Sequence, residues 1–279
     1  MLELKYPSFI YNSILNGKGN ISYLIKDNEM IIYFSNYDIK PSVNEPIFIR
    51  LNYQEIYQYL KINYVLDDNY INDNIYTLNL NKKTIAITFD DGPSEVTKDV
   101  LNTLKDNKST GTFFMLGNRL EKNVDIVNLV LASDNEVGTH SYYHKYLTRL
   151  NKKKRTVSIN KPTEIMEELF NTRPIYFRPP YGNLTPKIKS EINLPIILWN
   201  VDPEDWHYRN AETIKNNVLS VIKDGDIVLL HDIFPTTGEA LKLLLPELYV
   251  RGYQVVSVSK LAELKGVTLE VSKAYRSIK

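Results

Sequence analysis

Acidic, imidazole and guanidinium side chains follow short apolar runs at five points of the sequence. An aspartate pair, Asp90-Asp91, comes directly after TIAITF, and two histidines four residues apart, His140 and His144, come after EVGT. The other three clusters are RPPYG at 178–182, DPEDW at 202–206 and the pair His231-Asp232. An aspartate with two imidazoles leaves an open position on a bound zinc ion, which is typical of a catalytic site, and the same ligand types also suit non-haem iron(II).

Each cluster alone has an ordinary structural explanation. Asp-Gly followed by Pro is a common turn, RPPYG is typical of a rigid loop, and two histidines at this spacing are often unrelated to a metal. Their shared position is more informative, because every cluster follows a predicted strand. In a parallel barrel the carboxyl ends of the strands meet at one rim, where active sites are assembled. The sequence therefore predicts one site built from five loops.

The elements that must position these clusters alternate between strand and helix from Lys82 onward, which is typical of βαβ units and a parallel sheet. Predicted strands cover 84–89, 111–116, 136–139, 175–178, 196–201, 226–230 and 254–258. Predicted helices cover 95–106, 120–132, 163–170, 211–222 and 237–248, with Pro162 and Pro246 as starts or kinks. This pattern favours an α/β fold, a small or distorted (β/α) barrel.

The first 80 residues have a different composition and hold no histidine. Apolar runs at 21–25 and 30–35 around a turn predict a β-hairpin, with a third strand at 46–51 and a helical turn at 54–60. The Asp/Asn-rich stretch 67–74 is typical of a surface loop or linker. We expect a small α+β domain of unknown role at 1–80, a catalytic domain at 81–267 and a C-terminal tail at 268–279.

Composition excludes several classes of protein. With 279 residues, 43% hydrophobic and 24% charged, the chain is long enough to bury a full core and is not a disordered, collagenous or coiled-coil protein. A net charge of +1 gives no argument for nucleic acid or an anionic membrane as partner. No signal peptide or transmembrane segment is visible, and the absence of cysteine does not indicate a compartment.

The segments TFDDGP, HSYYH, RPPYG, DPEDW and LLHD, taken in this order, resemble the motifs of the NodB-type polysaccharide deacetylases, carbohydrate esterase family 4. The resemblance covers residues 82–265 and implies a distorted (β/α) barrel of the NodB type. It also implies a metal site, with zinc as the expected ion and cobalt or another divalent metal as an alternative. The ligands that the resemblance implies are Asp91, His140 and His144.

The resemblance also implies the remaining roles. Asp90 corresponds to a general base that takes a proton from the attacking water, and Arg178 orients it. His231 corresponds to the general acid that protonates the leaving amine, and Asp205 favours its protonated form. The backbone N–H of Tyr181 is expected to stabilise the oxyanion. Apolar contacts to the substrate are expected from Trp206, Leu229 and Pro180, whereas His207 and the run Lys152-Lys153-Lys154-Arg155 are expected to be solvated surface.

The implied reaction is metal-dependent hydrolysis of N-acetyl groups on an amino-sugar polymer with release of acetate. Peptidoglycan is the favoured substrate, and neither GlcNAc nor MurNAc is selected by the sequence. Alternatives are deacetylation of chitin oligomers, O-deacetylation of xylan, or a non-catalytic glycan-binding module that retains the fold. The full set of acid, base and ligand residues argues against the last of these. We expect an extracellular or cell-surface location, which for a full-length form could include a membrane anchor.

Overall fold

The computed structural model describes residues 21–26, 29–34, 47–52 and 82–279. The chain divides into two compact units, Met1–Ile75 and Tyr76–Lys279. Among the described residues no helix is long and apolar enough to cross a lipid bilayer.

The described part of the N-terminal unit is a three-stranded antiparallel sheet in the order β1-β2-β3. It consists of β1 (Ile21–Lys26), β2 (Glu29–Phe34) and β3 (Ile47–Asn52). The hairpin predicted from the apolar runs is present, and Lys26 pairs with Glu29 next to its turn. The helical turn expected at 54–60 and the linker expected at 67–74 lie outside the described residues.

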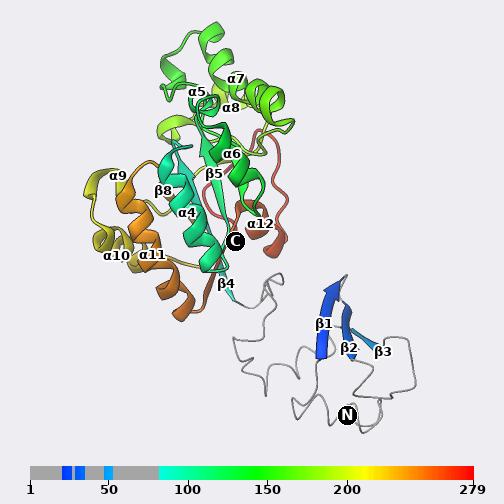
Figure 1. The fold of residues 1–279 in the computed structure, drawn as a ribbon. Coiled ribbons are helices and arrows are strands. Elements are labelled where there is room, and N and C mark those ends of the chain that lie inside the picture. The colour runs from blue at the N-terminus through cyan, green and yellow to red at the C-terminus, as the bar shows by residue number, and fades with distance from the viewer. Residues whose placement is uncertain (1–20, 27–28, 35–46, 53–81) are drawn as a thin grey trace. The chain divides into compact units, whose positions relative to one another are not determined.

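The second unit is built on a parallel sheet with flanking helices (Figure 1). The central strand β4 (Lys83–Asp90) pairs with β5 (Gly111–Met115) on one side and with β8 (Ile227–His231) on the other. Beyond β5 lies β6 (Glu136–Thr139), and the first half of β4 also pairs with β9 (Tyr253–Val256). Buried residues fill β4 and β5 along their whole length after Lys83, as expected for strands covered on both faces.

Single bridges close this sheet into a distorted barrel. Thr139 of β6 pairs with Phe177, Phe177 pairs with Ile196 of β7 (Ile196–Ile197), and Val201 pairs with Val228 of β8, all in parallel. The strand expected at 175–178 is therefore reduced to the bridges at Phe177. The strand expected at 196–201 is reduced to the two residues of β7 and the bridge at Val201. Pro174 and Pro179, which have no N–H to donate to a ladder, lie a few residues before and after Phe177. Near Val201 the side chain of Asn200 accepts from Ile227 N–H.

The helices cover the outside of the barrel. They include α4 (Glu95–Asp106), α10 (Ala211–Val221), α11 (Pro235–Val250), which contacts both of them, and α12 (Val258–Leu264). Shorter elements lie in the loops: η2 (Leu147–Arg149), η3 (Pro180–Gly182), α8 (Pro186–Ser190) and α9 (Asp205–Tyr208). Ser94 begins α4 as its N-cap, accepting from Val96 N–H, while Thr97 accepts from Ser94 N–H.

Two predicted helices differ from the structure. The helix expected at 120–132 begins later, as α6 (Val124–Leu131), and Leu120 instead ends a separate short helix, α5 (Gly117–Leu120). Between them the side chain of Asn123 donates to the carbonyl of Arg119. The helix expected to begin near Pro162 instead begins at Lys152 as α7 (Lys152–Phe170), where Asn151 caps it by accepting from Lys154 N–H. Pro162 lies inside the helix, buried against Gly117.

Two further expectations are corrected. Arg155 is not solvated surface: its side chain is buried and binds the Glu191 carboxylate through Nε and Nη2 at 2.6 and 2.8 Å. Residues 268–279 do not form a free tail, because β10 (Ala274–Tyr275) pairs with β7 and Ile278 is buried, with its N–H donating to the Gly225 carbonyl. Both differences arise from contacts between residues far apart in the sequence.

Candidate active site

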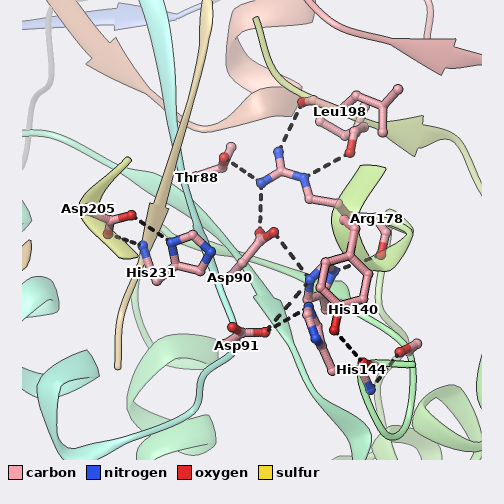
Figure 2. A network of polar contacts seen from close by, with 12 residues as sticks. Thr88, Asp90, Asp91, His140, His144, Arg178, Leu198, Asp205 and His231 are labelled. Carbon is pink, nitrogen blue, oxygen red and sulfur yellow. Dashed lines mark hydrogen bonds and ion pairs between the residues drawn. The ribbon is translucent and has the colours of Figure 1, made fainter. Parts of the chain in front are cut away.

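The end of β4 places two neighbouring carboxylates in the same site. Successive side chains of a strand point to opposite faces, so Asp90 and Asp91 can converge only if the backbone turns between them. The strand ends at Asp90, and Asp91 has a φ of 73°. This left-handed conformation turns the chain and brings both carboxylates toward the histidines that follow β6 (Figure 2).

Asp91, His140 and His144 form a cluster whose ligand atoms all lie within 4.8 Å of one another. Oδ1 of Asp91 is 3.4 Å from Nε2 of His144 and 3.8 Å from Nε2 of His140. Oδ1 is also buried and has no hydrogen-bond partner, which is costly for a carboxylate oxygen unless a cation binds there. The donor set and this orphaned oxygen fit a divalent metal ion.

His140 is prepared as a ligand by its surroundings. Its Nδ1 lies 2.8 Å from the carbonyl oxygen of Arg178, so Nδ1 carries the proton and donates, leaving the lone pair of Nε2 directed at the cluster. Burial lowers the pKa of His140 to about 3, which keeps the imidazole neutral at physiological pH. A metal ligand must be in this neutral form.

Asp90 is buried between Arg178 and His140. Nη1 of Arg178 donates to Oδ1 of Asp90 at 2.7 Å, and Oδ2 lies 3.4 Å from Nε2 of His140. Burial raises the pKa of Asp90, while the Arg178 charge opposes that rise. A carboxylate held by one cation and close to the metal ligands can accept a proton from a water molecule attacking at this site.

Arg178 is itself fully buried and fixed at every donor group. Nε donates to the carbonyl of Ile197 at 2.9 Å, Nη2 to that of Leu198 at 3.1 Å, and Nη1 also to the hydroxyl of Thr88 at 2.8 Å. The guanidinium carbon lies 4.0 Å from the centroid of the Phe114 ring. These contacts hold Arg178 in one position and thereby define the position of Asp90.

A second acid–base pair lies across the rim. Nδ1 of His231 is 2.7 Å from Oδ1 of Asp205, whose other oxygen accepts from His231 N–H at 2.8 Å and from Thr237 Oγ1 at 2.7 Å. Burial lowers the pKa of His231, but the hydrogen bond and charge of Asp205 outweigh it and raise the pKa to about 9. His231 is therefore protonated at neutral pH, as a proton donor requires.

The base and the acid face the same space. His231 is the register partner of Asp90 on the adjacent strand, and its imidazole points toward that carboxylate in Figure 2. The imidazoles of His140 and His144 lie on the other side of Asp90 (Figure 2). A substrate bound at the rim can thus meet a base and metal ligands on one side and a protonated imidazole on the other.

The remaining predicted site residues lie at the rim or directly beneath it. Tyr181 is 51% exposed with a φ of 62°, and its ring lies 4.6 Å from that of His144. Trp206 is 49% exposed on α9, whereas Pro180 is buried and Leu229 is buried within β8. His207 is exposed, as expected of a residue without a role in the site.

Sequence reasoning missed three residues that support the site. Thr88 binds Arg178, and a signal was available, because it lies two residues before Asp90 and so on the same strand face. Thr237 binds Asp205 from α11, which no local pattern indicates. Asp232 was noted within a motif but given no role; it is fully buried beneath the turn at Gly92, accepts from Thr97 Oγ1 at 2.5 Å and has one unpartnered oxygen.

A distorted parallel barrel carrying this acid, base and ligand set at one rim defines the class of NodB-type carbohydrate deacetylases. Residues 77–194 match the polysaccharide deacetylase domain family. The chain belongs to this family, the polysaccharide deacetylases of carbohydrate esterase family 4.

Curated relatives and solved structures support this family assignment. Over 190 residues the chain is 41% identical to the peptidoglycan-N-acetylmuramic acid deacetylase PdaC of Bacillus subtilis, covering 68% of this chain and 41% of that protein. The solved structure of that deacetylase superposes with a TM-score of 0.66 at 40% identity, covering 68% of this chain and 94% of the solved one. The peptidoglycan-N-acetylglucosamine deacetylase PgdA of Listeria monocytogenes is 35% identical over 92% of this chain and 55% of its own length.

A third relative carries a metal. A family 4 acetyl xylan esterase from Clostridium thermocellum, solved with a cobalt ion, superposes with a TM-score of 0.66 at 31% identity over 70% of this chain and 99% of the other. This chain spans only about half the length of the two curated peptidoglycan deacetylases.

Proposed function

We propose that this protein hydrolyses N-acetyl groups of an amino-sugar polymer, with peptidoglycan as its substrate, and releases acetate. The observation that carries the proposal is the His231–Asp205 pair, which faces the Asp90 base and the cluster of Asp91, His140 and His144 across one rim. The raised pKa of His231 is consistent with a role as proton donor. An amide needs protonation of its leaving nitrogen, so a histidine held in its charged form is matched to that substrate. The two peptidoglycan deacetylases named above support the choice of polymer.

The residues take complementary parts in this reaction. Asp90, oriented by Arg178, accepts the proton of the attacking water, and His231, oriented by Asp205, delivers a proton to the amine. The N–H of Tyr181 is proposed to stabilise the oxyanion, and Trp206, Leu229 and Pro180 to contact the sugar or its acetyl methyl group. Asp91, His140 and His144 would hold a zinc ion, which when bound polarises the acetyl carbonyl and activates water.

The location follows from the substrate and rests on the same proposal. Peptidoglycan lies outside the cytoplasmic membrane, so the enzyme would act at the cell surface or outside the cell.

Acetate release from defined substrates tests the proposal. The metal-loaded chain is incubated with peptidoglycan glycan strands, chitin oligomers and acetylated xylan, and acetate is quantified with the Asp90→Asn variant as control. We expect release from peptidoglycan strands exceeding that from xylan. Binding of these glycans without any release of acetate would instead identify a non-catalytic module.

Xylan O-deacetylation is the second candidate, because an acetyl xylan esterase of the same family shares the fold. An alkoxide leaving group depends less on a general acid than an amine does. Replacement of His231 by Ala separates the two functions: it should abolish amide hydrolysis while sparing much of the activity on an O-acetyl ester.

A further inference from the structure

The loop that carries the second histidine continues into a stack of side chains that ends in a cation. The His144 and Tyr181 rings lie 4.6 Å apart, Tyr181 stacks on Tyr146 at 4.0 Å with an angle of 12°, and the guanidinium of Arg149 lies 4.5 Å from the Tyr146 ring centroid. The stack thus links a ligand-cluster residue to an arginine through continuous contact. Its geometry fixes where the guanidinium lies relative to the site.

A second cation lies in the same loop. Tyr143 is 56% exposed, and Nζ of Lys145 is 5.7 Å from its ring centroid. Lys145 and Arg149 are both exposed. The segment around His144 therefore carries two exposed positive charges and an exposed aromatic ring.

The charged groups of these two cations are not engaged in ion pairs, unlike several other surface cations of the described chain. Lys98 pairs with Glu95 and Lys260 with Glu263, each within a helix. Neither Lys145 nor Arg149 forms a salt bridge with any residue that the structure describes. Their hydrogen-bond donors remain open to a ligand of opposite charge.

A stacked guanidinium suits one chemical class of ligand. When its face lies on an aromatic ring, its N–H groups point outward in the plane and match the two oxygens of a carboxylate. Because stacking already restricts the side chain, less conformational entropy is lost on binding. Two cations add little to the binding affinity of a neutral sugar, whereas they attract a sugar that carries a carboxylate directly.

We propose that Arg149 and Lys145 form a subsite that binds a carboxylate of the glycan, so that the enzyme selects carboxylate-bearing strands over neutral ones. In glycan strands of peptidoglycan from which the stem peptides have been removed, the group is the lactyl carboxylate of N-acetylmuramic acid, which chitin lacks. The proposal rests on the proposed function for the class of ligand, a glycan. It adds a structural reason for the enzyme to prefer carboxylate-bearing glycans to neutral ones.

The test compares two tetrasaccharides of equal length: chitotetraose, and the alternating GlcNAc–MurNAc tetramer with free carboxylates. The ratio of their kcat/KM values is measured for the unmodified chain, Arg149→Gln, Arg149→Lys and Lys145→Gln. We expect the unmodified chain to favour the carboxylated tetramer, and Arg149→Gln to reduce that preference about 10-fold, mainly through KM. Arg149→Lys should restore part of it, and added salt should weaken it.

Arg173→Gln is the matched control. Arg173 follows the C-terminus of α7, whereas Arg149 precedes its N-terminus, and 19 helical residues span roughly 28 Å. This control removes an equal charge and should leave the preference unchanged. Equal losses on both tetrasaccharides in Arg149→Gln, or no preference in the unmodified chain, would overturn the subsite.

Failure of the proposed function has a different signature. If neither tetrasaccharide releases acetate, the deacetylase function fails. The same preference is then measured as a ratio of dissociation constants by calorimetry on the unmodified chain and the variants. The subsite is thus decided in either case.

Discussion

The backbone carbonyl of Arg178 lies 2.8 Å from Nδ1 of His140, so a single residue fixes a candidate ligand with its main chain and the candidate base with its side chain. The main-chain contact depends only on where the chain enters the RPPYG loop. The side-chain contact depends on the guanidinium. Substitution of Arg178 therefore separates the two contributions.

Replacement of Arg178 by Gln is expected to lower kcat by about 10²-fold or more while metal binding persists. Without the opposing guanidinium charge, burial would raise the pKa of Asp90 further, so the acid limb of the pH–rate profile should move to higher pH. Metal content by calorimetry and the pH dependence of kcat measure the two effects. Loss of the metal from a folded Arg178→Gln protein would contradict this separation.

Arg178 is fully buried, so its variants need a stability control. Removing one partner of a buried ion pair typically costs about 3–5 kcal/mol. Arg178→Lys keeps the charge but not the fork of donors, so it should recover part of the pH shift and little of the positioning. Thermal unfolding of both variants identifies conditions in which the proteins are folded.

The sequence predicts the site better than it predicts the elements around it. The five motif clusters follow strand ends, and a parallel barrel brings such ends together whatever the exact strand lengths. The roles of Thr237 and Arg155 depend on partners 32 and 36 residues away, at Asp205 and Glu191. Local periodicity carries no information about such contacts. The position of Pro162 predicts a helix that begins near it, whereas the cap at Asn151 makes α7 begin at Lys152.

Asp205→Asn is expected to move the alkaline limb of the pH–rate profile to lower pH. Burial lowers the pKa of His231, and the hydrogen bond and charge of Asp205, with smaller contributions from Asp90 and Asp91, raise it to about 9. Without that carboxylate the pKa of the general acid falls from about 9 toward its ordinary value of 6.5. Rates on an amide substrate between pH 5 and 10 measure the limb. Thr237→Val, which removes one hydrogen bond to Asp205 but leaves the charge pair, should shift it much less.

The same pair predicts how stability depends on pH. The folded-state pKa of His231 lies above its unfolded value of 6.5, so the pair stabilises the fold fully below that pH. The contribution is lost as pH rises through about 9. The difference in unfolding free energy between the unmodified chain and Asp205→Asn should therefore be largest in mild acid and smallest above pH 9. A difference that grew with pH would contradict the raised pKa.

Gly92→Ala should destabilise the protein, because a Cβ at this position would overlap the carboxylate of the buried Asp232 and lie 2.8 Å from its Cγ. Overpacking of this kind costs about 1–3 kcal/mol, and the displaced turn should also disturb Asp91. Gly238→Ala is the matched control: it lies in helix α11, where a Cβ meets nothing closer than 3.9 Å. It should stabilise the protein by about 0.5–1 kcal/mol. Urea unfolding of both variants measures the contrast.

The last prediction distinguishes the two neighbouring carboxylates. Asp90→Asn keeps the ligand cluster, so metal content should persist while kcat falls by about 10²–10⁴-fold. Asp91→Asn replaces the oxygen that lies 3.4 Å from Nε2 of His144, so metal affinity itself should fall, and excess zinc or cobalt should recover part of the activity. Removal of the metal from the unmodified chain by a chelator should abolish activity, and added zinc or cobalt should restore it.

His231→Ala serves as the matched comparison for these two variants. It should retain the metal, as Asp90→Asn does, but its loss of rate should be much larger on amides than on activated esters, whose leaving groups need no proton. Calorimetric metal titration and rates on both substrate types decide among the roles. If Asp90→Asn lost the metal and Asp91→Asn retained it, base and ligand would be exchanged, and the orphaned Oδ1 of Asp91 would need a different explanation.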